Sequence, residues 1–369
     1  MIKYCKLCVL PNTKPNVIFE GNICSACKFH SRKKNNTKKG INWKKRKTQF
    51  NKLIQKIKSK KAPLFDVCVP VSGGKDSITQ VHHLLNKGLR ILAINVDYGI
   101  KTKIGIYNLN LIPKMGASLK IFTPDFKLQK KIIKISFERY GDPDLMSHCL
   151  LHAYPIRVAL SLKIPLVLHG ENSAYEYSGD TSYDEKFLDR KWFEEYAANK
   201  KMTPLKFAQK HNIDHNQIKI FDLPSDKDLK KTNVVFTSYY FKWSGETNLK
   251  IAKKYGFKSL KKPGEGTYRN YVGIDEKINR VHQYLKLLKF GYGRATDHAC
   301  EDIRNKRISR KTGIKLVLNH DRRPISPYIW KDFIKFLGIS KKSFFSTLNK
   351  YRNKRIWNKK NSTIMRKFI

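Results

Sequence analysis

A short apolar strand that runs straight into a glycine-rich turn most constrains what this chain can fold into. Residues 65–77 read FDVCVPVSGGKDS, and the stretch Phe65 to Val71 has the character of a buried parallel strand. Apolar residues at helical spacing follow from Ile78 to Leu85. A strand, a glycine-rich turn and a helix N-terminus bring backbone N–H groups and the helix dipole to one point, where they bind phosphate. The sequence therefore predicts an α/β sheet with a phosphate loop.

Each residue type in this turn suits a polyphosphate ligand. The two glycines allow the backbone to approach the ligand closely, and the two serines add hydroxyl donors. Lys75 offers a point charge to phosphate oxygens, and Asp76 offers a carboxylate ligand for Mg²⁺. Because the spacing differs from the G-x-x-x-x-G-K-[ST] pattern of a Walker A loop, the sequence predicts a phosphate loop of another kind.

Two further apolar runs end in polar residues. Leu89 to Val96 is followed by Asp97, and Ile164 to Leu168 is followed by His169-Gly170-Glu171-Asn172. The carboxyl ends of parallel strands form the ligand-binding edge of an open α/β sheet. We therefore expect Asp97 and the 169–172 loop beside the phosphate loop, while a turn or a helix cap is the alternative role for Asp97.

Four of the seven cysteines lie near the N-terminus at a metal-binding spacing. Two C-x2-C pairs are separated by fifteen residues, and each pair can turn two thiolates toward one tetrahedral ion. Disulfides and an iron–sulfur cluster are the alternatives, and four thiolates leave no open position for a catalytic water. We predict structural Zn²⁺ bound by Cys5, Cys8, Cys24 and Cys27.

The other three cysteines are interpreted as core residues. Cys68 lies in the apolar run before the phosphate loop. Cys149 and Cys300 each stand beside a histidine, which a thiol nucleophile would also do. Neither lies in a recognisable glutaminase nucleophile turn, so a core role is favoured for both.

The charge of the chain is its most conspicuous compositional feature. There are 76 Lys and Arg against 29 Asp and Glu, a formal net charge of +47. Such a charge is typical of nucleic-acid-binding proteins, but an AT-rich genome also gives a Lys- and Asn-rich composition. No acid occurs between Ser31 and Lys61, whereas acids outnumber bases between Glu138 and Tyr196. Since the site-bearing middle is acidic, nucleic acid is not the expected partner.

The composition also sets the class of protein. With 40% hydrophobic and 12% aromatic residues, the 369-residue chain can build a substantial core. No run approaches the roughly 18–20 apolar residues of a membrane span, and the first residues contain no signal-peptide core. We therefore expect a cytoplasmic protein without a membrane span.

Three regions are expected along the chain. Residues 1–40 form the four-cysteine module with a linker-like stretch from Ser31 to Gly40, residues 41–260 form the α/β domain, and residues 261–369 form a mainly helical, basic region. In the last region Asp275 to Phe290 has helical apolar spacing and stops at Gly291.

Two smaller features remain open to interpretation. A helix–glycine–helix pattern spans 333–351; it resembles a DNA-reading helix-turn-helix but is also a common helix connection. Asn108 and Asn110, in a helix expected after Asp97, can be ordinary surface polar residues.

The six residues SGGKDS are the signature of the PP-loop ATP pyrophosphatases, and the chain resembles that superfamily. Within it, the four-cysteine module followed by VSGGKDS is similar to the N-acetyl sugar amidotransferases of cell-surface glycan synthesis. The resemblance implies a doubly wound, mostly parallel α/β sheet, with an N-terminal zinc-ribbon or knuckle-like module and a helical C-terminal region. The other segments that carry the likeness are His169 to Asn172, Glu176 to Gly179, Tyr239 to Trp243, Gly264 to Tyr268 and Lys289 to Asp297.

The resemblance also implies a chemistry. In that family an acetamido oxygen of a sugar attacks the α-phosphate of ATP, and ammonia then displaces AMP to leave an acetamidino group. The expected substrate is a nucleotide sugar or a nonulosonic acid of lipopolysaccharide O-antigen biosynthesis, with ATP, Mg²⁺ and structural Zn²⁺ bound. Because the chain shows no glutaminase of its own, a glutaminase partner, with or without a cyclase-like subunit, would supply ammonia. The alternative is a PP-loop tRNA-modifying enzyme of the thiolation or lysidine type that binds RNA through its basic regions.

The site residues follow from the matching motifs. Lys75 and Asp76 are the expected catalytic residues, and Asp76 is also the expected Mg²⁺ ligand. Arg294 or Arg304 is a candidate for binding a phosphate or carboxylate of the sugar and His298 for a base, but a capped helix laced with ion pairs is the alternative for this cluster. ATP is assigned to Ser72, Gly73, Gly74, Lys75, Asp76, Ser77, Asp97 and Gly170, and the substrate to Glu171, Asn172, Glu176, Tyr177, Arg294, Asp297 and His298.

Overall fold

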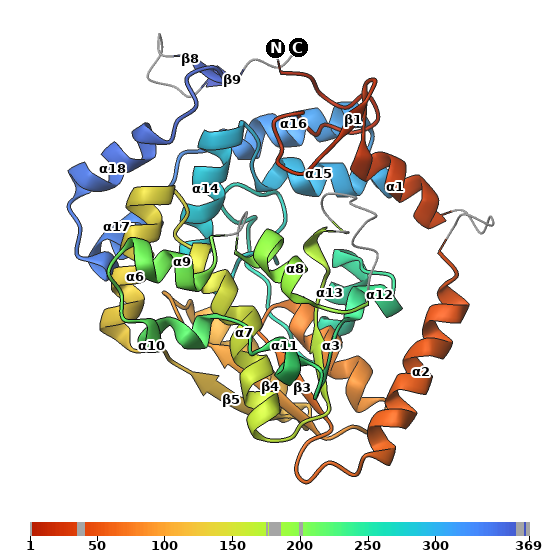
Figure 1. The fold of residues 1–369 in the computed structure, drawn as a ribbon. Helices are drawn as coiled ribbons and strands as arrows, with labels where there is room; N and C mark the ends of the chain where they lie inside the picture. The colour runs from red at the N-terminus through yellow and green to blue at the C-terminus, as the bar shows by residue number, and fades with distance from the viewer. Residues whose placement is uncertain are drawn as a thin grey trace.

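A five-stranded parallel sheet has the strand order β5-β4-β3-β6-β7 and lies in the lower half of the view in Figure 1, below the C-terminal helices. The computed structural model describes residues 2–34, 41–174, 176, 186–198, 202–358 and 365–366. The chain builds outward from β3 to β5 and then crosses to the other side of β3 for β6 and β7. This reversal leaves a crevice at the carboxyl ends of β3 and β6. The strands are β3 Val67–Pro70, β4 Ile91–Val96, β5 Ser118–Phe122, β6 Leu166–His169 and β7 Asn233–Phe236.

Each face of the sheet has its own apolar core because side chains alternate along every strand. Val67 and Val69 pack with helices α2 (Trp43–Ser59) and α3 (Lys75–Leu85). Cys68, Leu92 and Ile94 pack on the other face, against α7 (Leu145–Ser161). Strands buried on both faces are typical of parallel sheets, and the doubly wound α/β fold is confirmed.

Further helices surround this sheet. Two of them matter for the site: α13 packs along α3, and α6 carries apolar residues toward the C-terminal helices. The remaining helices around the sheet are α4 Lys103–Leu109, α5 Leu111–Lys114, α6 Phe126–Tyr140, α8 Arg190–Trp192, α9 Pro204–Lys210, α10 His215–Ile218, α11 Asp226–Leu229, α12 Thr237–Tyr240 and α13 Gly245–Lys254.

The N-terminal cysteine module is confirmed, and it packs against the C-terminal helices. It consists of the hairpin β1 (Phe19–Glu20) and β2 (Ile23–Cys24), followed by α1 (Ser25–Lys34). Its apolar residues share a core with α15 (Arg294–Arg304) and α16 (Arg310–Asp321), beside which it lies in Figure 1. The prediction of a linker from residue 31 is wrong for residues 31–34, which continue α1, and residues 35–40 lie outside the described residues.

The helical C-terminal region is also confirmed. The helix predicted from Asp275 begins at Ile278, because the Glu276 carboxylate accepts the N–H groups of Ile278 and Asn279 at 2.7 and 2.5 Å and so ends the preceding segment. Its stop at Gly291 is as predicted, with φ at +73°. Besides α15 and α16, the region contains α14 Ile278–Phe290, α17 Pro327–Leu337, α18 Lys341–Lys350, β8 Trp357–Asn358 and β9 Met365–Arg366.

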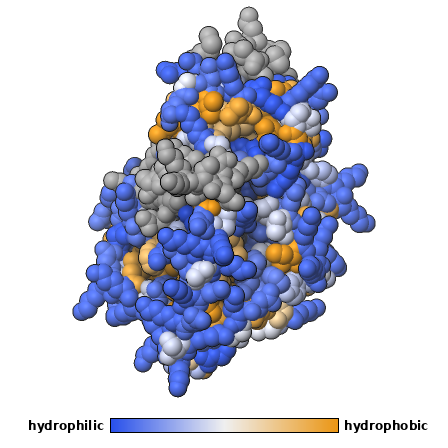
Figure 2. Space-filling model, turned by 90° about the vertical axis from the view of Figure 1, so that its right-hand side faces the viewer, coloured by the Kyte–Doolittle hydropathy of each residue, from blue (hydrophilic) through white to orange (hydrophobic). Residues whose placement is uncertain are grey.

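The surface interpretation of Asn108 is wrong. Asn108 is fully buried: its amide donates to the Lys258 carbonyl at 3.0 Å and accepts the Lys258 N–H at 2.9 Å. Asn110 is exposed, as expected. The face of the molecule in Figure 2 is largely hydrophilic, and among the described helices none is long and apolar enough to cross a membrane.

Candidate active site

The loop after β3 is shaped by its own serines and by one glycine. The Ser77 hydroxyl accepts the Ser72 N–H at 3.0 Å, and the Ser72 hydroxyl accepts the Gly74 N–H at 3.2 Å. Gly73 has φ at +88°, and a Cβ there would lie 2.9 Å from the Leu109 nitrogen. Because both the backbone angle and the close approach exclude a side chain, Gly73 is required for the turn. The serines, which we expected to serve a ligand, also hold the loop itself.

Asp76 is held in place by two neighbours. Its carboxylate accepts from Lys75 Nζ at 2.6 Å and from Asn248 Nδ2 at 2.6 Å. Asn248 belongs to α13 and is only 3% exposed, and its carbonyl accepts from the Thr79 hydroxyl at 3.1 Å. The carboxylate itself remains 31% exposed. Asp76 is thus an oriented, accessible oxygen donor, which suits Mg²⁺.

Two adjoining cavities meet at this loop. The helix-side cavity, of about 590 Å³, extends toward α1, α13 and α15, and the sheet-side cavity, of about 570 Å³, extends along the strand ends toward α7 and α14. A site in two parts can hold a nucleotide and a second reactant at the same loop. The residues that line both cavities are Ser72, Asp76, Tyr98, Glu171, Asp275, Glu276, Asn279, Arg294 and Asp297.

Carboxylates gather where the sheet-side cavity meets the strand ends. Asp97 lines this cavity and forms an ion pair with Lys101 at 3.1 Å, and Gly170 and Glu171 line it from the loop after β6. Asp275 and Glu276 add two carboxylates that sequence reasoning missed. Burial raises the pKa of Asp275, and burial with nearby carboxylates raises the pKa of Glu276 well above its ordinary value. The loops after β3, β4 and β6 therefore meet at one edge, as expected.

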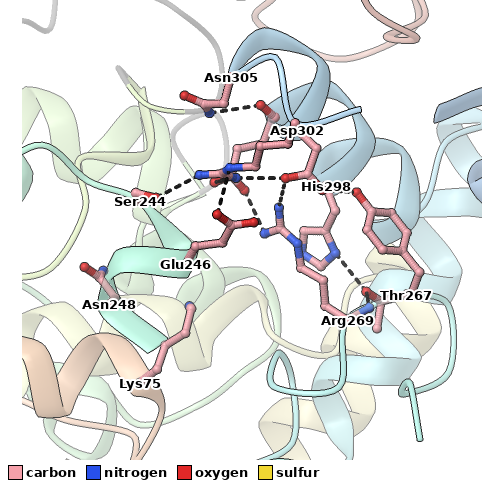
Figure 3. A network of polar contacts seen from close by, with 12 residues as sticks. Lys75, Ser244, Glu246, Asn248, Thr267, Arg269, His298, Asp302 and Asn305 are labelled. Carbon is pink, nitrogen blue, oxygen red and sulfur yellow. Dashed lines mark hydrogen bonds and ion pairs between the residues drawn. The ribbon is translucent and has the colours of Figure 1, made fainter. Parts of the chain in front are cut away.

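A network of ion pairs forms the wall of the helix-side cavity (Figure 3). Arg269 pairs with Glu301 at 2.8 Å and with Asp302 at 2.7 Å, and its side chain is only 6% exposed. Arg307 pairs with Asp302 at 2.8 Å and reaches α13 through Glu246 at 3.1 Å. The network thus connects α15 to α13, the helix whose Asn248 donates to Asp76. The interpretation of this cluster as a helix laced with ion pairs describes α15 well.

The predicted substrate residues separate into three groups. Glu171, Glu176, Arg294, Asp297 and His298 line the helix-side cavity. Asn172 is buried outside both cavity linings, where its Oδ1 accepts from Trp192 Nε1 at 2.9 Å. Tyr177 lies outside the described residues.

The neighbours of His298 and Arg304 bear on their candidate roles as a base and as an anion-binding residue. His298 Nδ1 contacts the Thr267 hydroxyl at 2.8 Å, and burial with nearby Arg294 keeps the pKa of His298 well below its ordinary value. A neutral, weakly basic imidazole fits a positioning role better than that of a base. Burial alone would lower the pKa of Arg304, but the nearby thiols of Cys300 and of the N-terminal cysteines raise it. We therefore relate Arg304 to the cysteine module, although it also lines the helix-side cavity.

The four N-terminal cysteines fit one tetrahedral ion. Their Sγ atoms all lie within 4.8 Å of one another, with Cys5–Cys27 at 3.9 Å and Cys8–Cys24 at 3.8 Å. Zinc–sulfur bonds of about 2.3 Å in a tetrahedron require sulfur separations of about 3.8 Å. Four buried thiols at these separations are compatible with structural Zn²⁺. The other cysteines, Cys68, Cys149 and Cys300, are buried free thiols whose pKa values burial raises, as a core role predicts.

The cysteine module contributes to the active-site walls. Ala26, Phe29 and His30 of α1 line the helix-side cavity, and Lys14 lines the sheet-side cavity. Arg310 of α16 donates to the Cys8 carbonyl at 2.9 Å, which fixes the module against the C-terminal helices. The module is therefore a structural part of the site.

Comparisons with known proteins found similarity over parts of the chain. Residues 265–368 match a family model described as the C-terminal domain of WbpG-like LPS biosynthesis proteins. No curated protein matches the chain. Among solved structures, the chain is similar to one described as a predicted subunit of tRNA methyltransferase from Methanocaldococcus jannaschii, with 15% identity and a TM-score of 0.25 over 54% of this chain and 78% of that chain. The C-terminal part of the chain is therefore similar to a domain of proteins described as acting in LPS biosynthesis.

Proposed function

We propose that the protein is an ATP-dependent amidotransferase that converts an acetamido group of a sugar to an acetamidino group, in the biosynthesis of a cell-surface glycan. One observation carries the proposal. The PP-loop and the segment that matches LPS biosynthesis proteins line the same cavity, since Lys75 and Asp76 lie on one wall and Arg294 and Glu301 lie on another. A nucleotide loop that faces a sugar-biosynthesis domain suits ATP-driven activation of a sugar.

The first step is the activation of an unreactive group. An amide carbonyl is a poor electrophile, and its oxygen is a poor leaving group. The acetamido oxygen attacks the α-phosphorus of ATP, the bond from that phosphorus to pyrophosphate breaks, and an imidoyl-adenylate forms. The loop N–H groups and Lys75 are suited to stabilise the charge that develops on pyrophosphate. Mg²⁺ on Asp76 would neutralise phosphate charge.

In the second step ammonia adds to the imidoyl carbon and AMP leaves with the former amide oxygen. The ammonia proton is then lost to solvent or to a carboxylate, and the amidine product takes up a proton. Glu171 and Asp275 are suited to this role because they line both cavities. The described residues contain no cysteine with the exposure of a glutaminase nucleophile, since every free cysteine is buried. We therefore propose a separate glutaminase partner, with or without a cyclase-like subunit.

The test is release of AMP and pyrophosphate with ammonium supplied. Nucleotide-linked acetamido sugars, nonulosonic acids and bulk tRNA are compared as second substrates. We expect stoichiometric AMP release with one class of sugar, and a product mass lower by about one unit because NH replaces O. Release stimulated only by tRNA would instead establish an RNA-modifying enzyme. A glutaminase that neither binds the protein nor makes turnover depend on glutamine would overturn the partner proposal alone.

A further inference from the structure

Three cations surround one carboxylate where α14, α15 and the cysteine module meet. Asp297 forms ion pairs with Lys14 at 3.2 Å and with Lys286. Burial alone would raise the pKa of Asp297, but Lys286, Lys14 and Arg294 hold it well below its ordinary value. Lys14 comes from the cysteine module, Lys286 from α14, and Arg294 from the first turn of α15. Four residues from three elements of the chain are therefore brought together at one point.

This cluster has a surplus of two positive charges, since three cations share one carboxylate. The side chains of Lys14 and Lys286 are only 12% and 15% exposed. Both ammonium groups also lie over the Tyr292 ring, at 5.5 and 4.9 Å from its centroid. Mutual repulsion and burial make a concentrated, poorly solvated positive charge costly, and the pKa of Lys286 is lowered accordingly. A bound anion would remove this cost.

The cations face the site and not only one another. Lys14, Lys286 and Arg294 all line the sheet-side cavity, and Arg294 lines the helix-side cavity as well. Among the described residues none forms a hydrogen bond or an ion pair with the Arg294 guanidinium. Its planar fork is therefore available to a ligand, and carboxylate and phosphate groups match it in geometry.

The strand-end side of the same cavity is lined mainly by carboxylates. Asp76, Asp97 and Asp275 line it there, close to the loop that is suited to ATP and Mg²⁺. An anionic group of a second reactant would be repelled from this edge and attracted to the α14–α15 side. The charge distribution thus gives the second reactant an orientation.

We propose that Lys14, Lys286 and Arg294 form a subsite for an oxyanion, a carboxylate or a phosphate, carried by the sugar substrate. This inference rests on the proposed function and names the residues that would bind the anionic group of the acceptor. Asp297 is then a positioning residue, which holds two of the cations against their mutual repulsion. The cysteine module belongs to the subsite through Lys14, so that metal binding and recognition of the acceptor are physically connected.

The experiment measures sugar binding by calorimetry in the full-length, zinc-loaded protein. The PP-loop is first saturated with α,β-methylene-ATP, so that anions cannot bind there. The probes are N-acetylglucosamine, its 1-phosphate and N-acetylglucosaminuronic acid, which differ by one charged group. We expect at least one anionic sugar to bind tenfold or more tightly than the neutral sugar. The two anionic arms tell a phosphate from a carboxylate.

Variants connect that preference to the cluster. Lys14→Met and Lys286→Met should each remove most of the preference while affinity for α,β-methylene-ATP is kept, and Lys286→Arg should restore it. Lys335→Met, an exposed lysine on α17, is the matched control and should keep the preference. Should a methionine variant fail to fold, the wild-type protein still tests the subsite. Adding 200 mM NaCl should weaken the binding of the anionic sugar and leave the binding of the neutral sugar unchanged.

Two results would overturn the subsite. One is equal or absent binding of all three sugars to the wild-type protein, and the other is a preference that survives in the folded Lys14→Met/Lys286→Met double variant. A protein that prefers the acidic sugar but never releases AMP would keep the subsite and lose the proposed reaction. The two proposals therefore fail in different ways.

Discussion

The two halves of the active site are built by different means. On the sheet side, the loops after β3, β4 and β6 are placed by the strands themselves, and the turn at Gly73 is set by backbone angle and contact. On the helix side, the wall is held by side-chain ion pairs among Arg269, Glu301, Asp302 and Arg307 and by the cysteine module. Strand ends fix position through many backbone hydrogen bonds, whereas an ion-pair network depends on a few side chains.

Because of this difference, substitutions on the two sides should affect different properties, activity on the sheet side and stability on the helix side. A change of Asp76, whose carboxylate is 31% exposed, should remove chemistry and leave the free energy of unfolding nearly unchanged, because the surrounding loop and its scaffold are untouched. A change in the helix-side network or the module should lower stability and alter activity only indirectly. The predictions below test this separation, from the largest expected free-energy change to the smallest.

Loss of the metal should have the largest effect on stability. Structural zinc contributes on the order of 10 kcal/mol to small metal-binding modules. Cys24→Ser should therefore release the zinc and unfold the module, and the helix-side wall at α15 and α16 should loosen with it. Metal analysis and denaturant unfolding measure both effects, with one zinc per chain expected in the wild type. The control is Cys68→Ala, a buried cysteine of the sheet core that should keep the metal; a stable metal-free Cys24→Ser protein would show that the module is dispensable.

Asp76→Asn should abolish turnover and leave the fold intact. The substitution removes the negative charge from the oriented donor beside Lys75, and loss of a central catalytic group costs on the order of 10⁴-fold in kcat. AMP release is measured together with the free energy of unfolding. Asp125→Asn is the matched control, because Asn caps a helix as well as Asp does and Asp125 caps α6 away from both cavities. Retained activity in Asp76→Asn would mean that the role of the loop has been misjudged.

Arg269→Met should produce the opposite result to Asp76→Asn. It leaves Asp302, whose side chain is 8% exposed, without its closest buried cation, and a broken buried ion pair costs about 3 to 5 kcal/mol. The free energy of unfolding is measured in urea. Lys231→Met, which breaks the exposed pair with Asp228, should cost about 1 kcal/mol or less. Equal losses in the two variants would show that the network does not hold the wall.

The contrast also explains how much could be predicted from the sequence. The loops after β3, β4 and β6 were predictable because apolar runs that end in Gly, Asp or His are local patterns. Strand β5 was not, since it is an edge strand of mostly exposed side chains, SLKIF. The pairing of Asp76 with Asn248 joins residues 172 positions apart, and no local pattern marks it. Asp275 and Glu276 resemble an ordinary helix start, and only the fold brings them to the strand ends.

Asn248→Leu tests the hydrogen bond from Asn248 to Asp76, the contact that the sequence did not predict. Without its amide, the Asp76 carboxylate loses one of its two fixed partners, and loss of such a supporting contact to a metal ligand costs about 10- to 100-fold. We expect the Mg²⁺ concentration for half-maximal turnover to rise by this factor, while kcat at saturating Mg²⁺ recovers in part. Asn233→Leu is the control, because it loses a similar bond at 3.1 Å to the Pro165 carbonyl at the far end of β7. An unchanged Mg²⁺ dependence would separate Asn248 from the metal site.

The smallest expected effect concerns a contact between α14 and the segment before α7. His282 of α14 donates from Nδ1 to Asp142, before α7, at 2.7 Å, and Asp144 lies 4.0 Å from the same nitrogen. Burial alone would lower the pKa of His282, but Asp142 and Asp144 raise it above 6.5 against the opposing charge of Lys286. Burial alone would raise the pKa of Asp142, but His282, Lys289 and His148 hold it well below 3.8.

The signs of these two shifts define a pH window. A raised histidine pKa contributes stability that is complete below pH 6.5 and is lost as the pH rises through the folded-state value. A lowered aspartate pKa contributes stability that is present above pH 3.8 and is lost as the pH falls through its folded-state value. His282→Asn should therefore cost about 2 kcal/mol near pH 5.5 and much less at pH 9, where the wild-type histidine is neutral. Urea unfolding of both proteins at pH 5.5, 7 and 9 measures this difference, and a cost independent of pH would mean that the charge of His282 does not stabilise the contact between α14 and the segment before α7.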